Sequence, residues 1–484
     1  MSREAKGKLT LADLVAGLTD GPLPGGLPAV EIRRAVIDSR QATPGSLFIA
    51  LRGQRQDGHD FIADAIARGA VAVIAERAWP ECKPVAEGAN LQICKFANCH
   101  GLIVPDSLTA LQQAAAYWRR QHDVRVIGIT GSVGKTTGKE MIAAVLRQRY
   151  RTLKSQGNYN NEIGLPLTLL HLTADQERVV LEMGMYALGE IAQLAEIARP
   201  QVGVVTNVGP THLERLGTLA RIAQAKAELP RALPPAEEGG VAILNADDER
   251  VRAMADLTPA RVFTYGLSPD ADLWADEIES AGLEGVRFRL HHRGESLHVR
   301  TPMLGRHSVH TALCAAAVGL VEGLSWEEIV GGLQDQTAQL RLTVTPGLRG
   351  ALILDDTYNS SPASCIAALN LLAELEGRKI AVLGDMYELG DYAEQGHRQV
   401  GRRARDVADR LITVGELGRI IAQEARAVGL GAEAVQAAAT NEEAIALLRD
   451  LLEPGDVVLV KGSRGVQMEE IVQALAAPRQ EGAP

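Results

Sequence analysis

A chain of 484 residues is too long to fold around one hydrophobic core, so two to four domains are expected and three is the working number. Hydrophobic residues make up 46% of the chain and charged residues 23%, as in ordinary globular proteins, and no apolar run is long enough to span a membrane. The net charge of -10, with few aromatic residues and no basic stripe, argues against a nucleic-acid-binding surface. Small anionic ligands are still compatible with this charge, because a local nest of backbone amides can bind phosphate on an acidic protein.

The start of the chain and its cysteines indicate the cellular compartment in which the protein is expected to act. The first residues, MSREAKGKLTLADLV, lack the apolar core of a signal peptide, so we expect a cytoplasmic protein. An odd, scattered set of cysteines is typical of reduced thiols, and this chain has five: Cys82, Cys94, Cys99, Cys314 and Cys365. The segment CKFANCH has no second Cys/His pair at metal-ligand spacing, so buried or incidental thiols are favoured there over a metal site.

Three α/β sections follow one another along the chain. In the first, RRAVIDSRQATPGSLFIALRG and FIADAIARGAVAVIAE predict strands and one helix. The second opens with an amphipathic helix in DSLTALQQAAAYWRRQH, which Asp106 or Ser107 would cap, and with the buried strand VRVIGI. The apolar runs RVVLEMG, VGVVTNVG and GVAILNADD then predict parallel strands joined by crossover helices. In the last section, ALILDD, KIAVLGD, RLITVG and DVVLVKGS predict a separate Rossmann-like sheet.

These sections define the predicted fold class and domain limits. We predict an α/β protein with a small α/β N-terminal domain at residues 1–104, a central P-loop ATPase-type domain with a parallel sheet at 105–337, and a Rossmann-like C-terminal domain at 338–484. The first limit precedes the helix that begins near residue 106. The second falls near GGLQDQTAQLRLTVTPG, where helical periodicity stops.

The segment GITGSVGKTTGKE, residues 128–140, departs from the usual phosphate-loop template because Ile129 stands where that template has its first glycine. Glycines at 131 and 134 nevertheless let the backbone fold tightly after the strand, and the amides of the following helix can face an anion. Lys135 can reach terminal phosphates, and the Thr136 hydroxyl can ligate magnesium. A nucleotide-binding cradle is therefore favoured over a glycine-rich turn with a solvated lysine. The predicted loop residues are Thr130, Gly131, Ser132, Val133, Gly134, Lys135, Thr136 and Thr137.

Two side chains that suit magnesium follow strands of the same predicted sheet. Glu182 ends the run RVVLE, and His212 follows VGVVTNVGPT. Open α/β sheets place ligands at the carboxyl ends of their strands, so both side chains could reach one metal ion. Each residue alone would more often be structural, as a helix cap or a satisfied loop histidine. The occurrence of both residues at strand ends beside the phosphate loop favours a metal site.

The shortened spacing T-G-x-x-G-K-T resembles that of the Mur ligase and folylpolyglutamate synthetase superfamily, whose enzymes use ATP to make an acyl phosphate and then an amide. The resemblance covers nearly the whole chain, from DSRQATPGSLFIALRGQRQDGHDF through GNYNNEIGLPLTLL, LEMGMYALGEIAQL, TNVGPTHLERLGT, DDTYNSSPAS and LGDMYELG to VKGSRG. These motifs are similar to the branch that adds D-alanyl-D-alanine to UDP-N-acetylmuramoyl-tripeptide. EMG and DDTYN stand where the related MurE branch has E-V-S-S and D-Y-A-H.

The resemblance implies an ATP-dependent amide ligase that needs ATP and Mg²⁺ and no protein nucleophile. The terminal carboxylate of the tripeptide attacks the γ-phosphate, and the D-alanyl-D-alanine amine then displaces phosphate, which gives the UDP-N-acetylmuramoyl-pentapeptide precursor of peptidoglycan. The third residue of the peptide can be diaminopimelate or lysine. We expect a monomer without nucleic-acid or membrane partners.

Two other functions are weighed against this one. Another ligase of the superfamily, such as MurE or a folylpolyglutamate synthetase, is disfavoured by EMG, DDTYN and LGDMYELG. A non-catalytic nucleotide-binding regulator would not need Lys135, Glu182 and His212 together.

The resemblance also implies roles for single residues. Lys135, Lys226 and His212 are the expected catalytic residues, and Thr136, Glu182 and His212 the expected metal ligands. Lys226, in IAQAKAEL, corresponds to a lysine that CO₂ converts to a carbamate, which requires a neutral amine; the alternative is a solvated surface lysine. Arg341 corresponds to an arginine that contacts the ATP phosphates, and Asp356 to an aspartate that binds ribose.

For other residues a second interpretation of their role stays open. Asp355 could replace Asp356 as the ribose partner, and either could merely cap the helix after SSPAS. Residues of two polar segments are expected to bind the UDP substrate, although asparagines in loops often only cap turns. These residues are Asp38, Ser39, Arg40, Asn158, Asn160 and Asn161.

The chain departs from the superfamily pattern in one place. Where that pattern has G-x-H-N-x-x-N-A-L, the chain has GRHSVHTAL, with Ser308 and Thr311 in place of both asparagines. The amide that would hydrogen-bond adenine is therefore absent, and hydroxyl groups stand in its place. ATP binding is expected, with altered contacts to the base.

Overall fold

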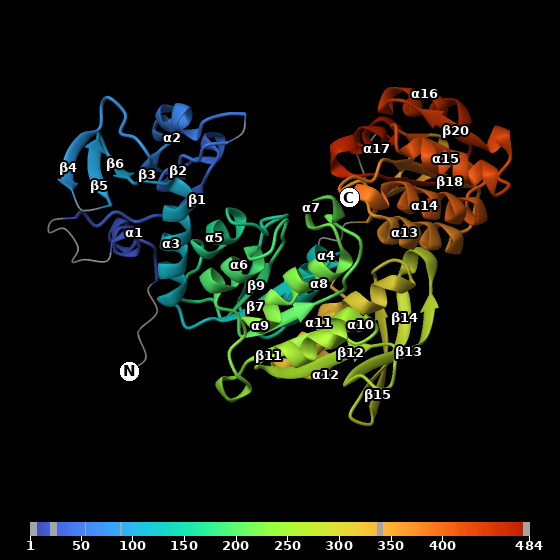
Figure 1. Cartoon of the computed structure of the whole chain (residues 1–484), viewed down its shortest axis with the longest axis horizontal. Coiled ribbons are helices and arrows are strands. Elements are labelled where there is room, and N and C mark those ends of the chain that lie inside the picture. The colour runs from blue at the N-terminus through green and yellow to red at the C-terminus, as the bar shows by residue number, and fades with distance from the viewer. Residues whose placement is uncertain (1–6, 20–26, 54, 88–89, 336–341, 478–484) are drawn as a thin grey trace, which may run out of the picture.

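The computed structural model describes residues 7–19, 27–53, 55–87, 90–335 and 342–477. It contains three sheets with helices packed against them, and Figure 1 shows the N-terminal and C-terminal units at opposite ends of the molecule with the middle unit between them. Within the described residues no helix is both long and apolar enough to cross a membrane. The structure therefore has the predicted α/β class with three sheet-centred units.

The first sheet has six strands in the order β1 (Arg34–Val36), β2 (Ser46–Ile49), β3 (Ala70–Ala75), β6 (Cys99–Ile103), β5 (Gln92–Phe96) and β4 (Lys83–Glu87). Strands β1, β2, β3 and β6 are parallel, whereas β4, β5 and β6 are antiparallel. The helices α1 (Leu11–Leu18) and α2 (Ile62–Ala67) belong to this unit.

The cysteines of this sheet differ from the prediction. Cys82 and Cys94 form a disulfide, so the expectation of five reduced thiols is wrong for this pair. Antiparallel pairing of β4 with β5 brings the two residues together, and their spacing in the sequence does not show this pairing. Cys99, Cys314 and Cys365 are free and buried, and burial raises the pKa of each thiol to about 12.

The middle sheet has nine strands. Their order is β15 (Glu295–Thr301), β14 (Val286–His292), β13 (Leu273–Ser280), β12 (Arg261–Gly266), β11 (Val241–Asn245), β10 (Val202–Val205), β7 (Arg125–Thr130), β9 (Arg178–Glu182) and β8 (Thr152–Lys154). Strands β7 to β13 are parallel, as predicted for β7, β9, β10 and β11. The antiparallel strands β14 and β15 extend the sheet and were not predicted.

Helices cover both faces of the middle sheet. One face packs against α4 (Lys135–Leu146), α11 (Val309–Val321) and α12 (Trp326–Leu333). The other face packs against α3 (Ser107–Arg120), α5 (Gly164–Leu169), α6 (Glu190–Ala198) and α9 (Glu228–Arg231), and its core continues into the first sheet. The remaining helices are α7 (Leu213–Leu216), α8 (Leu219–Lys226) and α10 (Glu249–Arg252). Asp106 caps α3 by accepting a hydrogen bond from the Thr109 amide, which decides between the two predicted caps.

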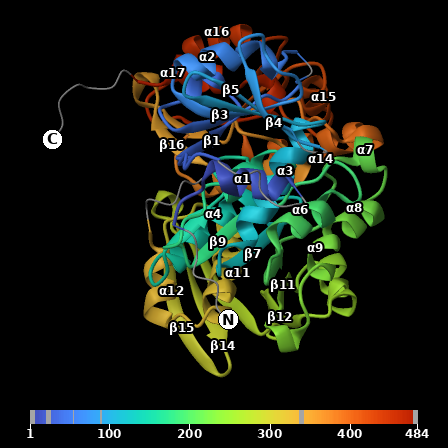
Figure 2. The same ribbon diagram turned by 90° about the vertical axis from the view of Figure 1, so that its left-hand side faces the viewer.

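The third sheet has six strands in the order β16 (Thr343–Pro346), β17 (Leu352–Asp355), β21 (Val457–Lys461), β18 (Lys379–Gly384), β19 (Arg410–Val414) and β20 (Val435–Ala438). All are parallel except β16. Its faces are covered by α13 (Pro362–Glu374), α14 (Ala393–Val407), α15 (Gly418–Ala427), α16 (Asn441–Leu451) and α17 (Glu469–Leu475). The predicted domain limit between residues 337 and 338 lies outside the described residues, and the limit at 104 stays a prediction. Figure 2, turned by a quarter, views the molecule from the side of the first unit, which lies in front of the third, with the middle unit below them.

Candidate active site

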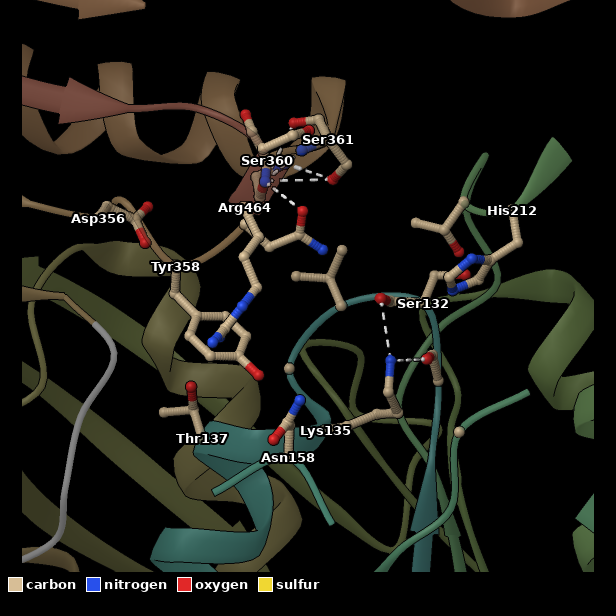
Figure 3. Close-up of a pocket in the computed structure, with 18 of the residues that line it drawn as sticks. Ser132, Lys135, Thr137, Asn158, His212, Asp356, Tyr358, Ser360, Ser361 and Arg464 are labelled. Atoms are coloured by element: carbon tan, nitrogen blue, oxygen red, sulfur yellow. Dashed lines mark hydrogen bonds between the residues drawn. The ribbon is translucent and has the colours of Figure 1, made fainter. Parts of the chain in front are cut away.

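A cavity of about 450 Å³ lies between the middle and C-terminal units. From the middle unit it is lined by the phosphate loop, the asparagine segment and the ends of β9 and β10. From the C-terminal unit it is lined by the segments that follow β17, β18 and β21. Figure 3 shows Lys135, His212 and Asp356 around one open space. Carboxyl ends of parallel strands from two sheets therefore face each other across this cavity.

The phosphate loop connects β7 directly to α4, as predicted. Gly134 is the N-cap of α4 with φ 87°, and Gly131 has φ 152°, so both adopt backbone conformations that favour glycine. A Cβ on Gly131 would lie 1.8 Å from the Thr206 hydroxyl oxygen. The Lys135 ammonium donates to the carbonyl oxygens of Gly131 and Ser132 at 2.7 and 3.3 Å. The lysine is thus folded back over its own loop.

The segment after β10 braces this loop. The Asn207 carboxamide oxygen accepts a hydrogen bond from the Val133 amide at 2.9 Å, and the Thr206 hydroxyl donates to the Val133 carbonyl oxygen at 2.7 Å. The Ser132 hydroxyl donates to the Gly209 carbonyl oxygen at 3.0 Å. Thr206 and Asn207 were not among the predicted site residues, although the quoted motif TNVGPTH contains them.

Glu182 lies fully buried at the end of β9 beside the start of α4. Its carboxylate accepts hydrogen bonds from the Thr136 hydroxyl at 2.7 Å and from the side-chain amide of Asn160 at 2.8 Å. The Lys139 ammonium is 4.0 Å away. The structure therefore brings together the predicted metal residues Thr136 and Glu182 and the predicted substrate residue Asn160.

An oxygen set of this kind fits magnesium. Among the described residues, no group of three or more His, Cys, Asp and Glu side chains is placed to hold a metal ion by itself. Magnesium typically keeps several waters and takes one or two carboxylates together with substrate phosphates, so it does not require such a group. One buried carboxylate and one hydroxyl at the phosphate loop are compatible with that mode.

His212 lines the same cavity in the loop that follows β10, with φ 57°. Its Nδ1 lies 2.5 Å from Oε2 of Glu388 in the C-terminal unit, and its ring meets the Tyr186 ring edge-on at 5.0 Å between centroids. The neighbouring His212 imidazole holds the pKa of the Glu388 carboxyl below its usual range.

Lys226, at the end of α8, is 2% exposed and lines the cavity, so the alternative of a solvated surface lysine is wrong. Burial lowers the pKa of this amine well below its usual value, and the charge of Lys135 lowers it further. A neutral amine is the form that can take up CO₂.

The predicted asparagines occupy different places. Asn158, Asn160 and Asn161 all line the cavity. Asn161 also accepts a hydrogen bond from the Gly164 amide at the start of α5 at 3.0 Å, which is the turn-capping alternative.

Asp38, Ser39 and Arg40 lie in the first unit and do not line the cavity; Asp38 accepts hydrogen bonds from the Arg40 amide and side chain. Arg341 lies outside the described residues.

The two aspartates at the carboxyl end of β17 differ in their contacts. Asp356 lines the cavity, and its carboxylate accepts a hydrogen bond from the buried ammonium of Lys461 at 2.6 Å. Asp355 instead accepts hydrogen bonds from the Thr357 amide and hydroxyl. Ser361 is the N-cap of α13, so the alternative that an aspartate caps this helix is wrong. Lys461 was missed as a site residue, although its place at the end of a predicted strand was a usable signal.

Comparisons with known proteins agree with this arrangement. Family profiles described as "Mur ligase family, catalytic domain", "Mur ligase middle domain" and "Mur ligase, glutamate ligase domain" match residues 31–119, 129–319 and 340–464. A UDP-N-acetylmuramoyl-tripeptide–D-alanyl-D-alanine ligase of Mycobacterium tuberculosis is 40% identical over 91% of each chain. This chain belongs to the Mur ligase family.

Solved structures place the chain within that family. It is similar to MurF from Acinetobacter baumannii, with a TM-score of 0.82, 34% identity and coverage of 97% of this chain and 99% of the other. It is also similar to MurF ligase from Thermotoga maritima in complex with ADP, with a TM-score of 0.75, 29% identity and coverage of 91% and 96%. The chain is thus a Mur ligase of the MurF type.

The two residues that depart from the superfamily pattern also lie at the cavity. Ser308 and Thr311 both line it, together with His307 and Met303. Ser308 is buried, and its hydroxyl donates a hydrogen bond to the Met303 carbonyl oxygen at 3.5 Å. The altered base contacts remain a prediction, because hydroxyl groups line the cavity where the superfamily pattern has amides.

Proposed function

We propose that this Mur ligase joins D-alanyl-D-alanine to UDP-N-acetylmuramoyl-tripeptide with the conversion of ATP to ADP and phosphate. The observation that carries the proposal is the cavity in which the phosphate loop, Glu182 and the buried Lys226 face Asp356 of the other unit. The relatives named for this reaction cover more than nine-tenths of the chain, which supports the same substrates. We infer a monomeric enzyme that acts in the cytoplasm, where ATP and the nucleotide-linked substrate are available.

The reaction divides into two steps. In the first, a terminal carboxylate oxygen of the tripeptide attacks the γ-phosphorus of ATP, the bond to the β-phosphate oxygen breaks, and an acyl phosphate and ADP form. In the second, the D-alanyl-D-alanine amine attacks the acyl carbon, and inorganic phosphate and a proton are released. Lys135 and the amides at the start of α4 stabilise the charge on the transferring phosphoryl group.

The remaining residues bind and orient the substrates. We assign Thr136, Glu182 and His212 to magnesium, which when bound would neutralise phosphate charge. Lys226, as a carbamate, would add an anion beside that site. Asp356 would accept hydrogen bonds from the ATP ribose, and its pairing with Lys461 fixes its position. Asn158 and Asn160 would contact the substrate near the phosphates, and Asp38, Ser39 and Arg40 the uridine diphosphate.

Phosphate release tests this proposal. The purified enzyme with ATP, Mg²⁺ and UDP-N-acetylmuramoyl-tripeptide should release phosphate at a sustained rate only when D-alanyl-D-alanine is added. Lys135→Ala should lower this rate about 100-fold to 1,000-fold, because it removes a donor to the transferring group. Lys8→Ala, which changes an exposed lysine paired with Glu31, is the matched control and should keep the wild-type rate. ATP binding without dipeptide-dependent phosphate release would favour a nucleotide-binding regulator instead.

A further inference from the structure

One contact joins the middle and C-terminal units beside the cavity. The loop after β18 contains Glu388 and Gly390, and it meets α7, which directly follows His212. The Glu214 amide donates a hydrogen bond to the Glu388 carbonyl oxygen at 3.3 Å, and a Cβ on Gly390 would lie 3.0 Å from the Glu214 Cα. Figures 1 and 2 both show α7 against the C-terminal unit. The two backbones are therefore in direct contact.

The same contact brings two side chains together. Nδ1 of His212 is shielded from solvent and, within the described residues, has no hydrogen bond of regular geometry. The Glu388 carboxylate lies 2.5 Å from it. Buried polar groups of proteins are nearly always hydrogen-bonded, and hydrogen bonds at active sites often become well aligned only when substrates bind. A small rotation of the imidazole would align its N–H with the carboxylate.

The backbones of His212 and Glu388 both adopt an uncommon conformation at this pairing. His212 has φ 57° and Glu388 has φ 63°, in the left-handed region that residues other than glycine rarely adopt. The Tyr186 ring holds the imidazole from one side, and the Arg215 guanidinium lies over that ring at 4.6 Å. Backbone conformations of this kind persist where surrounding contacts hold them, and they concentrate at functional sites.

We propose that Glu388 is a positioning residue for His212, and that it fixes the orientation of the imidazole only while the C-terminal unit is docked on the middle unit. This inference rests on the proposed role of His212. A histidine that serves a metal or a substrate through one ring nitrogen commonly donates from the other to a carboxylate, which sets its tautomer. Here that carboxylate comes from a different domain, so the His212 site is complete only in the docked molecule.

An isolated ion pair at a protein surface contributes little to stability. Nearness to a histidine would therefore not by itself distinguish Glu388 from other acidic residues. Glu388 differs because its partner atom is shielded, because the backbones also touch, and because both residues line the cavity. Glu394, which pairs with Arg398 within α14, offers a matched control for the loss of a paired carboxylate.

The first test is the tautomer of His212 in the protein with metal removed and ADP bound. Nitrogen-15 spectra of labelled histidines, assigned with His212→Ala, should show a proton on Nδ1 in the wild type. Glu388→Ala should give a mixture of tautomers, whereas Glu388→Gln, whose carboxamide oxygen still accepts a hydrogen bond, should retain most of the Nδ1 form. Glu394→Gln should match the wild type, and thermal melts should confirm that each variant is folded.

Kinetics form the second test. Glu388→Ala should lower kcat about 10-fold to 100-fold, with Glu388→Gln between it and the wild type. In a His212→Ala background, Glu388→Ala should cause no further loss, because nothing remains to be positioned. An unchanged His212 tautomer in Glu388→Ala, or a full further loss in the double variant, would overturn the inference and leave the proposed function standing. Wild-type activity of His212→Ala would overturn the assignment of His212 and the inference with it.

Discussion

At the scale of single residues, the cavity combines polar groups that hydrogen-bond one another with one buried lysine, Lys226, which is 2% exposed. Thr136, Glu182 and Asn160 lie in motifs with known spacing, and the structure brings them into hydrogen-bonding contact. The burial of Lys226 could not be read from the helical segment IAQAKAEL, because lysines of amphipathic helices usually face solvent. The pairing of His212 with Glu388 depends on how two domains dock, which no local pattern encodes.

Lys226 is expected to act as a CO₂-derived anion. Lys226→Ala should lower the ligase rate about 10-fold or more, and formate or acetate should partly restore it by filling the vacated anion position. The physical reason is that burial favours the neutral amine, the form that reacts with CO₂. Rates measured with added carboxylic acids and, as the control, added alkylamines check this. Rescue by amines in place of acids would show that the residue acts as a cation.

At the scale of elements, β7, β9, β10 and β11 of the middle sheet and β17, β18, β19 and β21 of the C-terminal sheet could be predicted, because buried parallel strands are short, apolar and β-branched. The antiparallel extension β14 and β15 was missed, since its alternating polar and apolar residues make a weaker signal than a continuous apolar run. The disulfide between Cys82 and Cys94 was missed for a related reason, because it depends on the pairing of β4 with β5.

The turn between β7 and α4 should not tolerate a side chain at Gly131. Gly131→Ala places a Cβ 1.8 Å from the Thr206 hydroxyl oxygen in a backbone conformation that favours glycine, so we expect a loss of about 3 kcal/mol in the free energy of unfolding. Gly429→Ala has the same kind of backbone, φ 103°, but open space around the added Cβ, and it should lose only about 1 kcal/mol. Urea unfolding without nucleotide compares the two, and equal losses would show that the loop can move away from Thr206.

At the scale of the whole molecule, the predicted UDP-binding residues and the predicted ATP-binding residues lie in different units. Asp38, Ser39 and Arg40 belong to the first sheet unit, whereas Asp356 lines the cavity from the third. Residue patterns indicated this division into three units and put the phosphate loop and the ribose aspartate on different units, but they did not show which side chains pair between those two units.

This division predicts a split in the Michaelis constants. Arg40→Ala should raise KM for UDP-N-acetylmuramoyl-tripeptide about tenfold, the loss expected for one charged hydrogen bond, and leave KM for ATP unchanged. Asp356→Asn should do the reverse, because its carboxylate is assigned to the ribose. Each variant serves as the control for the other, with thermal melts to confirm folding. A rise in KM for both substrates in either variant would contradict separate binding by the two units.

The Lys135 ammonium already contacts the Gly131 and Ser132 carbonyl oxygens. When a nucleotide arrives, this ammonium exchanges two neutral acceptors for anionic phosphate oxygens and need not be stripped of a full hydration shell at that moment. Binding at this point is then an exchange of partners, whose free energy is the difference between two sets of hydrogen bonds. A ligand without phosphate charge gains little from such an exchange, so we expect Lys135 to favour phosphorylated nucleotides over uncharged nucleosides.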